Sequence, residues 1–217
     1  MSKFFGVSGT HLDRAVQTAR GGFVGTPTLR AGERYTGVVW EYLGLASLSA
    51  PDRRWAANHV AVVSGLLGLA LVGDAVPDYR LKMGARLPVI GNLAKWWKPK
   101  LEFALREVAH RSEVIDLLPK EHAAACDPAV AARRTTRVEF MSADGAHAAG
   151  HAAKMAKGLT ARVLIERRTH TTEVICKSAA IPGYVFDTVR DVNERDNATV
   201  IALRAKVAPV CKVREEG

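Results

Sequence analysis

The sequence predicts an α/β (α+β) fold, in which a mixed β-sheet is covered by helices within a single compact domain spanning residues 1–217. Three observations support this prediction. A chain of 217 residues with 48% hydrophobic residues can bury one core of ordinary domain size. Apolar residues recur at helical spacing in 92–109, and residues 150–166 have the pattern of a helix with a cationic side. Short apolar runs of strand length alternate with these helical segments, an order typical of α/β proteins.

In the first half of the chain, Gly and Pro mark the expected element boundaries. Ser49 is placed to cap a helix that has Pro51 in its first turn. The patterns predict, in order, a turn opening a helix within 4–20, a loop over 21–32, a short helix over 41–45, the helix after Ser49, a buried strand over 59–63, and a loop over 65–77.

In the second half, the apolar patterns are longer. Pro99 interrupts the 92–109 pattern, so it must kink that helix or mark its first turn. The patterns predict a helix over 92–109, strands over 114–118 and 138–141, a helix over 150–166, strands over 183–187 and 198–203 joined by a polar turn at 193–197, and a flexible tail at 212–217.

The charge of the chain favours a polyanionic partner. Thirty-one Lys and Arg against 22 Asp and Glu give a formal net charge of +9, with a pI near 9.7. Such a balance suits nucleic acid or a small anionic metabolite.

Cysteine content and hydropathy indicate the cellular compartment in which the protein is expected. Cys126, Cys176 and Cys211 form neither a disulfide framework nor a Cys-x-x-Cys metal site, which favours a reducing compartment. No signal-peptide pattern and no apolar run of about 18 residues is present, so we expect a cytoplasmic protein without a membrane span. The oligomeric state is not encoded in these patterns.

Two basic stretches stand out in the sequence. Residues 80–111 contain eight Lys or Arg against two acids, and residues 133–168 contain eight against three. If both line one cleft, they form a footprint for a phosphate backbone. The alternative is that both are solvated helix faces.

Several separated motifs resemble one known family. They are Tyr35-Thr-Gly37, Val63-Ser-Gly-Leu-Leu-Gly68, Tyr79-Arg-Leu-Lys-Met-Gly84, Leu93 to Trp97, and Lys154 to Arg162. In order and spacing they resemble the YaaA (peroxide stress protein) family over roughly residues 4–190. The chain resembles a divergent member with a shortened N-terminus, because the Ser-Pro-Ala-Lys type of motif with which family members begin has no counterpart here.

The resemblance implies a YaaA-like α/β fold, DNA binding through a helix-hairpin-helix-like element, and a role under peroxide stress. The partial hairpin region would fall within residues 1–33. Its phosphate-facing residues would be Gly6, Ser8, Gly9 and Thr10, since backbone N–H groups at a helix N-terminus bind phosphate without reading sequence. A plain helix-start turn is the alternative interpretation of the same residues.

A wider set of residues is the candidate anion-binding or nucleic-acid-binding surface. It combines the hairpin residues with aromatic and cationic side chains from the motifs. The additional members are Tyr35, Thr36, Tyr79, Arg80, Lys82, Trp97, Lys98, Lys154, Lys157 and Arg162.

Four of the charged residues are candidate catalytic groups if the protein is an enzyme: Arg80, Asp116, Lys154 and Lys157. The guanidinium of Arg80 suits bidentate contact with phosphate or carboxylate, although it could instead pair with Asp78 or Asp116. Asp116 follows apolar strand residues, where a carboxylate needs a partner or a function. Ion pairing with Arg80 and a role as general base are the two hypotheses for Asp116.

We expect no metal site and no cofactor. His147 and His151 have a chelating i, i+4 spacing, but no third ligand is evident nearby, and such pairs are more often surface features. Ser64 is not preceded by the Gly that a hydrolase nucleophile elbow requires, so the sequence does not predict a hydrolase.

The sequence therefore supports a DNA-binding protein of the YaaA type that holds phosphate in a basic cleft. The alternative is an enzyme that acts on a nucleobase, a nucleotide or another small anionic metabolite in a biosynthetic pathway.

Overall fold

The computed structural model describes residues 8–22, 25–169, 171–177, 181–192 and 198–206. Gly6, the 193–197 turn and the 212–217 tail lie outside the described residues. The helices are α2 (Thr10–Gly21), α3 (Ala31–Arg34), α4 (Val38–Leu43), η1 (Leu45–Ser47), α5 (Ala50–His59), α6 (Leu93–Ala109), α7 (Lys120–Ala123), η2 (Pro128–Val130), α8 (Gly150–Glu166) and α9 (Glu173–Cys176). The strands are β1 (Thr28–Arg30), β2 (Ala61–Ser64), β3 (Gly68–Leu71), β4 (Ala75–Pro77), β5 (Arg86–Leu87), β6 (Gly91–Asn92), β7 (Glu113–Asp116), β8 (Arg134–Met141), β9 (Tyr184–Val192) and β10 (Ala198–Ala205).

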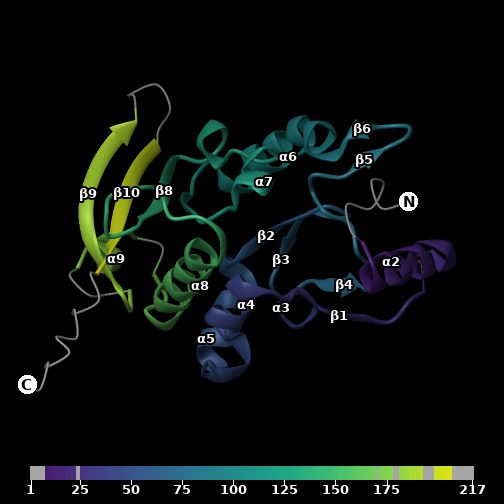
Figure 1. Cartoon of the computed structure of the whole chain (residues 1–217), viewed down its shortest axis with the longest axis horizontal. Helices are drawn as coiled ribbons and strands as arrows, with labels where there is room; N and C mark the ends of the chain where they lie inside the picture. Colours follow the sequence, from purple (N-terminus) through teal and green to yellow (C-terminus); the bar gives the residue numbers. More distant parts are fainter. Residues whose placement is uncertain (1–7, 23–24, 170, 178–180, 193–197, 207–217) are drawn as a thin grey trace, which may run out of the picture.

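The largest sheet has four strands in the order β7-β8-β10-β9 (Figure 1). β8 is parallel to both β7 and β10, whereas β10 is antiparallel to β9. The sheet is therefore mixed, as predicted. α8 covers one of its faces, where Ala156 and Leu164 pack with Val138, Phe140 and Ile201.

Three two-stranded sheets lie outside this main sheet: β1 with β4, β2 with β3, and β5 with β6. The predicted loops over 21–32 and 65–77 are wrong in part, because β1, β3 and β4 lie within them. Each has only three or four residues, too few to show an apolar pattern typical of strands. Each forms a strand because it makes backbone hydrogen bonds with a partner strand.

The two long helices match their predicted spans closely. Asn92 caps α6 by accepting a hydrogen bond from the Lys95 amide at 2.9 Å. Pro99 lies inside α6 rather than in its first turn. Ser49 caps α5 as predicted, accepting from the Asp52 amide at 3.2 Å.

α4 and α8 pack closely against each other (Figure 1). Gly158 makes this close approach possible, since a Cβ there would collide with the Val39 carbonyl oxygen. Leu43 and Leu48 are buried together with Ile165 of α8. α8 therefore joins the sheet on one side to α4 and α5 on the other.

Among the described residues, no helix combines the length and the apolar character that crossing a membrane requires.

Candidate functional site

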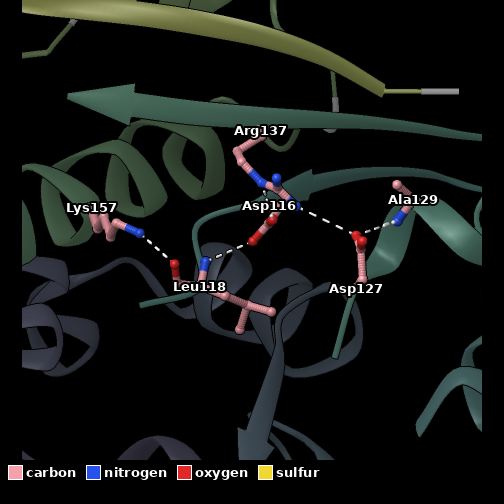
Figure 2. Close-up of polar contacts among 6 residues, drawn as sticks. All are labelled: Asp116, Leu118, Asp127, Ala129, Arg137 and Lys157. Atoms are coloured by element: carbon pink, nitrogen blue, oxygen red, sulfur yellow. Dashed lines mark hydrogen bonds and ion pairs between the residues drawn. The ribbon is translucent and has the colours of Figure 1, made fainter. Parts of the chain in front are cut away.

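Asp116 is the buried centre of a polar network in which Arg137 and Asp127 are partly exposed (Figure 2). It is the last residue of β7 and lies directly across the parallel register from Arg137 of β8. Asp116 is only 4% exposed. One carboxylate oxygen accepts from Arg137 Nε at 3.0 Å, and the other accepts from the Leu118 amide at 2.8 Å. Both oxygens thus have a donor within the protein.

The predicted ion pair between Asp116 and Arg80 is wrong, because Arg137 takes that position. Arg80 instead lies 3.6 Å from Asp78, and its guanidinium also donates to the Tyr79 carbonyl oxygen at 2.9 Å. This was the other pairing considered for Arg80. Local proximity along the chain decides its partner, whereas Asp116 pairs through strand register.

Lys157 joins the network from α8. Its ammonium group donates to the Leu118 carbonyl oxygen at 2.5 Å. Burial lowers the pKa of Lys157; nearby Asp116 partly opposes this effect, and Arg137 adds to it. Arg137 also lies 3.4 Å from Asp127, whose carboxylate accepts from the Ala129 amide. The network in Figure 2 therefore links β7, β8, α8 and η2.

A second polar cluster contains two of the predicted aromatic residues. The Tyr79 hydroxyl lies 2.7 Å from the Ser64 hydroxyl and 3.0 Å from the Tyr35 hydroxyl. Ser64 accepts from the Leu66 and Leu67 amides at 3.2 and 3.0 Å. Burial is the main cause that raises the pKa of Tyr79. This cluster holds Tyr35 in a fixed orientation.

Two of the predicted binding residues pack within the protein. Trp97 donates its indole N–H to the Gly65 carbonyl oxygen at 2.9 Å, and its ring lies against Gly68. Arg162 donates to the Leu43 and Gly44 carbonyl oxygens at 3.1 and 3.2 Å. Arg162 thereby binds the carbonyl end of α4, where the helix dipole favours a cation.

The remaining predicted residues lie at the surface. Ser8, Gly9 and Thr10 are exposed at the start of α2, and Thr36 is exposed before α4. Lys98 is exposed and forms an i, i+4 ion pair with Glu102 at 2.9 Å. Lys82 and Lys154 are exposed and make no ion pair within the described part of the chain.

The four candidate catalytic residues do not share one set of contacts. Asp116 and Lys157 meet through Leu118. Arg80 belongs to the Asp78 group, and Lys154 is an exposed residue of α8.

The 82–111 segment carries five exposed cations whose side chains have neither a hydrogen bond nor an ion pair among the described residues: Lys82, Arg86, Lys95, Arg106 and Arg111. β5, β6 and α6 lie next to one another along the upper side of the molecule in Figure 1. We call these five residues the α6 basic surface.

An open pocket of about 1020 Å³ was missed from the sequence. It is lined by residues of β1, α3, α4 and α5, among them Arg30, Trp40 and Arg54, together with the predicted Tyr35 and Thr36. The Tyr35-Thr-Gly-Val-Val-Trp40 string and the Arg53-Arg54 pair were visible as sequence signals, but nothing in the sequence placed them together.

The described residues contain no group of three His, Cys, Asp or Glu side chains that could hold a metal ion. His147 precedes α8 and lies 3.9 Å from Glu139, whereas His151 lies edge-on to the Tyr42 ring. The two histidines therefore face different neighbours.

The structure is thus that of an α/β protein with a mixed sheet, exposed cations around α6, and a polar network of Asp116, Arg137 and Lys157. The sequence model of the family described as "Peroxide stress protein YaaA" matches residues 1–190, so the chain belongs to that family.

Three curated relatives carry the name UPF0246 protein. One from Streptomyces coelicolor is 39% identical over 140 residues, which are 64% of this chain and 54% of the relative. One from Bordetella avium is 34% identical over 163 residues, covering 70% and 62%. One from Paracidovorax citrulli is 30% identical over 168 residues, covering 74% and 64%. The chain thus spans between 54% and 64% of the length of these relatives.

Proposed function

We propose that this protein binds nucleic acid through the phosphate backbone, in keeping with a role under peroxide stress. The observation that carries the proposal is the α6 basic surface, five exposed cations without an ion pair in the described part of the chain. Cations without an internal ion pair can contact phosphates directly, and this contact releases counterions from the nucleic acid.

The spacing of these cations favours a polymer over a small anion. Lys95 and Arg106 are eleven residues apart on α6, so they lie on one face of the helix, about 17 Å apart along its axis. The Lys98–Glu102 pair lies between them and is internally neutralised. A single small metabolite cannot bridge that distance, whereas a nucleic-acid backbone presents a row of phosphates.

The test is a salt titration of duplex DNA binding with the full chain. Wild-type protein should lose affinity steeply as salt rises, with log K falling linearly against log[salt]. The double variant Lys95→Gln/Arg106→Gln should bind more weakly, and its slope should fall by about 1 for each phosphate that the variant no longer neutralises.

The matched control is Arg134→Gln/Arg167→Gln, which removes the same charge from the other basic stretch. Both arginines are exposed and have no ion pair within the described residues. The control should change the slope less. Weak binding that is flat from low to moderate salt would refute the proposed function. Equal losses in both double variants would refute the assignment to the α6 basic surface.

A second candidate function is an enzyme acting on a nucleobase, a nucleotide or another small anionic metabolite. The observation that favours it is Lys157, a half-buried amine with a lowered pKa beside Asp116 and Arg137. Turnover of a nucleotide panel, followed by chromatography, tests this candidate. Activity should collapse in Lys157→Met and persist in Lys95→Gln/Arg106→Gln; turnover that is equal in wild type and Lys157→Met would exclude this site.

A further inference from the structure

The open pocket between β1, α3, α4 and α5 has an aromatic wall. The rings of Tyr35 and Trp40 stack with their centroids 5.6 Å apart and their planes 23° apart. Both residues line the pocket. Gly37 separates them with a φ of 110°, a backbone conformation that favours glycine, and this turn brings the two rings to the same side.

The aromatic wall is held in place from behind. The Tyr35 hydroxyl is fixed by Tyr79, which in turn bonds Ser64. Trp40 packs beside the buried Leu43 and Leu48. A surface that is ordered before binding costs less entropy when a flat ligand stacks on it.

Charged groups of both signs surround the wall. Arg30 and Arg54 line the pocket, are exposed, and have no ion pair within the described residues. Arg53 also lines it, but its guanidinium donates to the Leu48 carbonyl oxygen. Glu41 contributes an exposed carboxylate to the same pocket.

We propose that this pocket binds a single nucleotide. The base stacks on the Tyr35–Trp40 wall, and the phosphate is held by Arg30 and Arg54. Glu41 accepts a hydrogen bond from an exocyclic amine or a ribose hydroxyl. A volume of about 1020 Å³ accommodates a ligand of this size.

The nucleotide has two possible sources, a free nucleotide or an unpaired nucleotide of a nucleic acid. Their recognition chemistry is the same. The nucleic-acid source rests on the function proposed above, whereas the free nucleotide does not.

Calorimetric titration of the full chain tests the proposal with AMP, GMP, CMP and UMP, the corresponding nucleosides, a short single strand and a fully paired duplex. We expect saturable binding of a nucleotide and at least tenfold weaker binding of its nucleoside. Arg30→Gln/Arg54→Gln should weaken nucleotide binding at least tenfold; both residues are exposed, so the fold should survive.

The control Lys95→Gln/Arg106→Gln should leave nucleotide affinity unchanged while reducing duplex affinity. If the single strand binds but no free nucleotide does, and Arg30→Gln/Arg54→Gln abolishes that binding, the pocket is supported and the nucleotide comes from a nucleic acid. Binding of neither ligand overturns the proposal, even when duplex binding remains. The proposal is also overturned if nucleoside and nucleotide bind with equal affinity and Arg30→Gln/Arg54→Gln leaves nucleotide affinity unchanged. Nucleotide binding without duplex binding leaves the pocket standing and refutes the proposed function alone.

Discussion

The two basic stretches contain the same number of cations but use them differently. In 80–111, the cations that find partners do so within four residues: Arg80 with Asp78, Lys98 with Glu102, and Lys100 with Trp96. In 133–168, most partners are distant in sequence, although Arg162 also pairs with Glu166 four residues away at 2.9 Å. Arg162 reaches Leu43, 119 residues away, and Arg168 reaches Asp52.

The difference follows from the position of each helix in the fold. α6 packs one face on its own core cluster and leaves the other to solvent, while α8 lies between the main sheet and α4. Lys157 and Arg162, on the packed sides of α8, therefore meet carbonyl groups of neighbouring elements, whereas Lys154 faces solvent. Among the described residues, five of the eight cations in 80–111 have neither a hydrogen bond nor an ion pair, against three of the eight in 133–168. The other five in 133–168 contact groups that lie elsewhere in the sequence.

The largest expected effect is on stability, from removal of Asp116. Asp116→Ala should lower the free energy of unfolding by about 3 kcal/mol, because Arg137 and the Leu118 amide lose their acceptor. Urea unfolding measures the change. Glu107→Ala is the control, since that carboxylate is exposed and has neither a hydrogen bond nor an ion pair among the described residues, so its removal should leave the free energy of unfolding nearly unchanged. Equal stability of Asp116→Ala and the control would contradict the cross-linking role of this stretch.

A smaller loss is expected from Arg162→Met. The variant keeps much of the aliphatic stem but loses the hydrogen bonds to the Leu43 and Gly44 carbonyl oxygens and to the Ser47 hydroxyl, together with the surface ion pair to Glu166. The cost should be about 1–2 kcal/mol. Thermal unfolding checks this, with Arg167→Met as the control, since Arg167 is exposed and has no ion pair in the described part of the chain. The salt slope of DNA binding should stay at the wild-type value. A changed slope with unchanged stability would place Arg162 in the binding surface and remove the contrast between the stretches.

The features that could be predicted from the sequence were local ones. The spans of α6 and α8, the cap at Ser49, and the place of Asp116 within or at the end of a strand all depend on residues within one element. The pairing of β9 with β10 also follows two apolar runs close in sequence.

What could not be predicted depends on tertiary placement. Arg137 faces Asp116 because two parallel strands align in one register, and no local pattern encodes that register. β3 and β4 are short and rich in small residues, so their strand state comes from pairing. The pocket joins Arg30, Trp40 and Arg54 from three elements, which is why only Tyr35 and Thr36 of its lining were among the predicted residues.

The smallest expected effect is a pH dependence from Lys157. Burial lowers the pKa of its ammonium group in the folded protein below the ordinary value of 10.5, so the unfolded chain binds more protons in the window between the two values. Stability conferred through this residue therefore rises with pH across that window. The effect is small because Asp116 opposes it and the side chain is only half-buried.

Urea unfolding of wild type and Lys157→Met from pH 7 upwards isolates this contribution. The difference in unfolding free energy should shift in favour of the wild type as pH rises, because the wild type alone sheds a charge that burial disfavours. Lys154→Met, which removes an exposed ammonium group from the same helix, is the matched control for the substitution itself. A flat or falling difference for Lys157→Met would mean that its ammonium group is as well solvated as the cations of the α6 basic surface, and the distinction between the two stretches would then rest on the arginines alone.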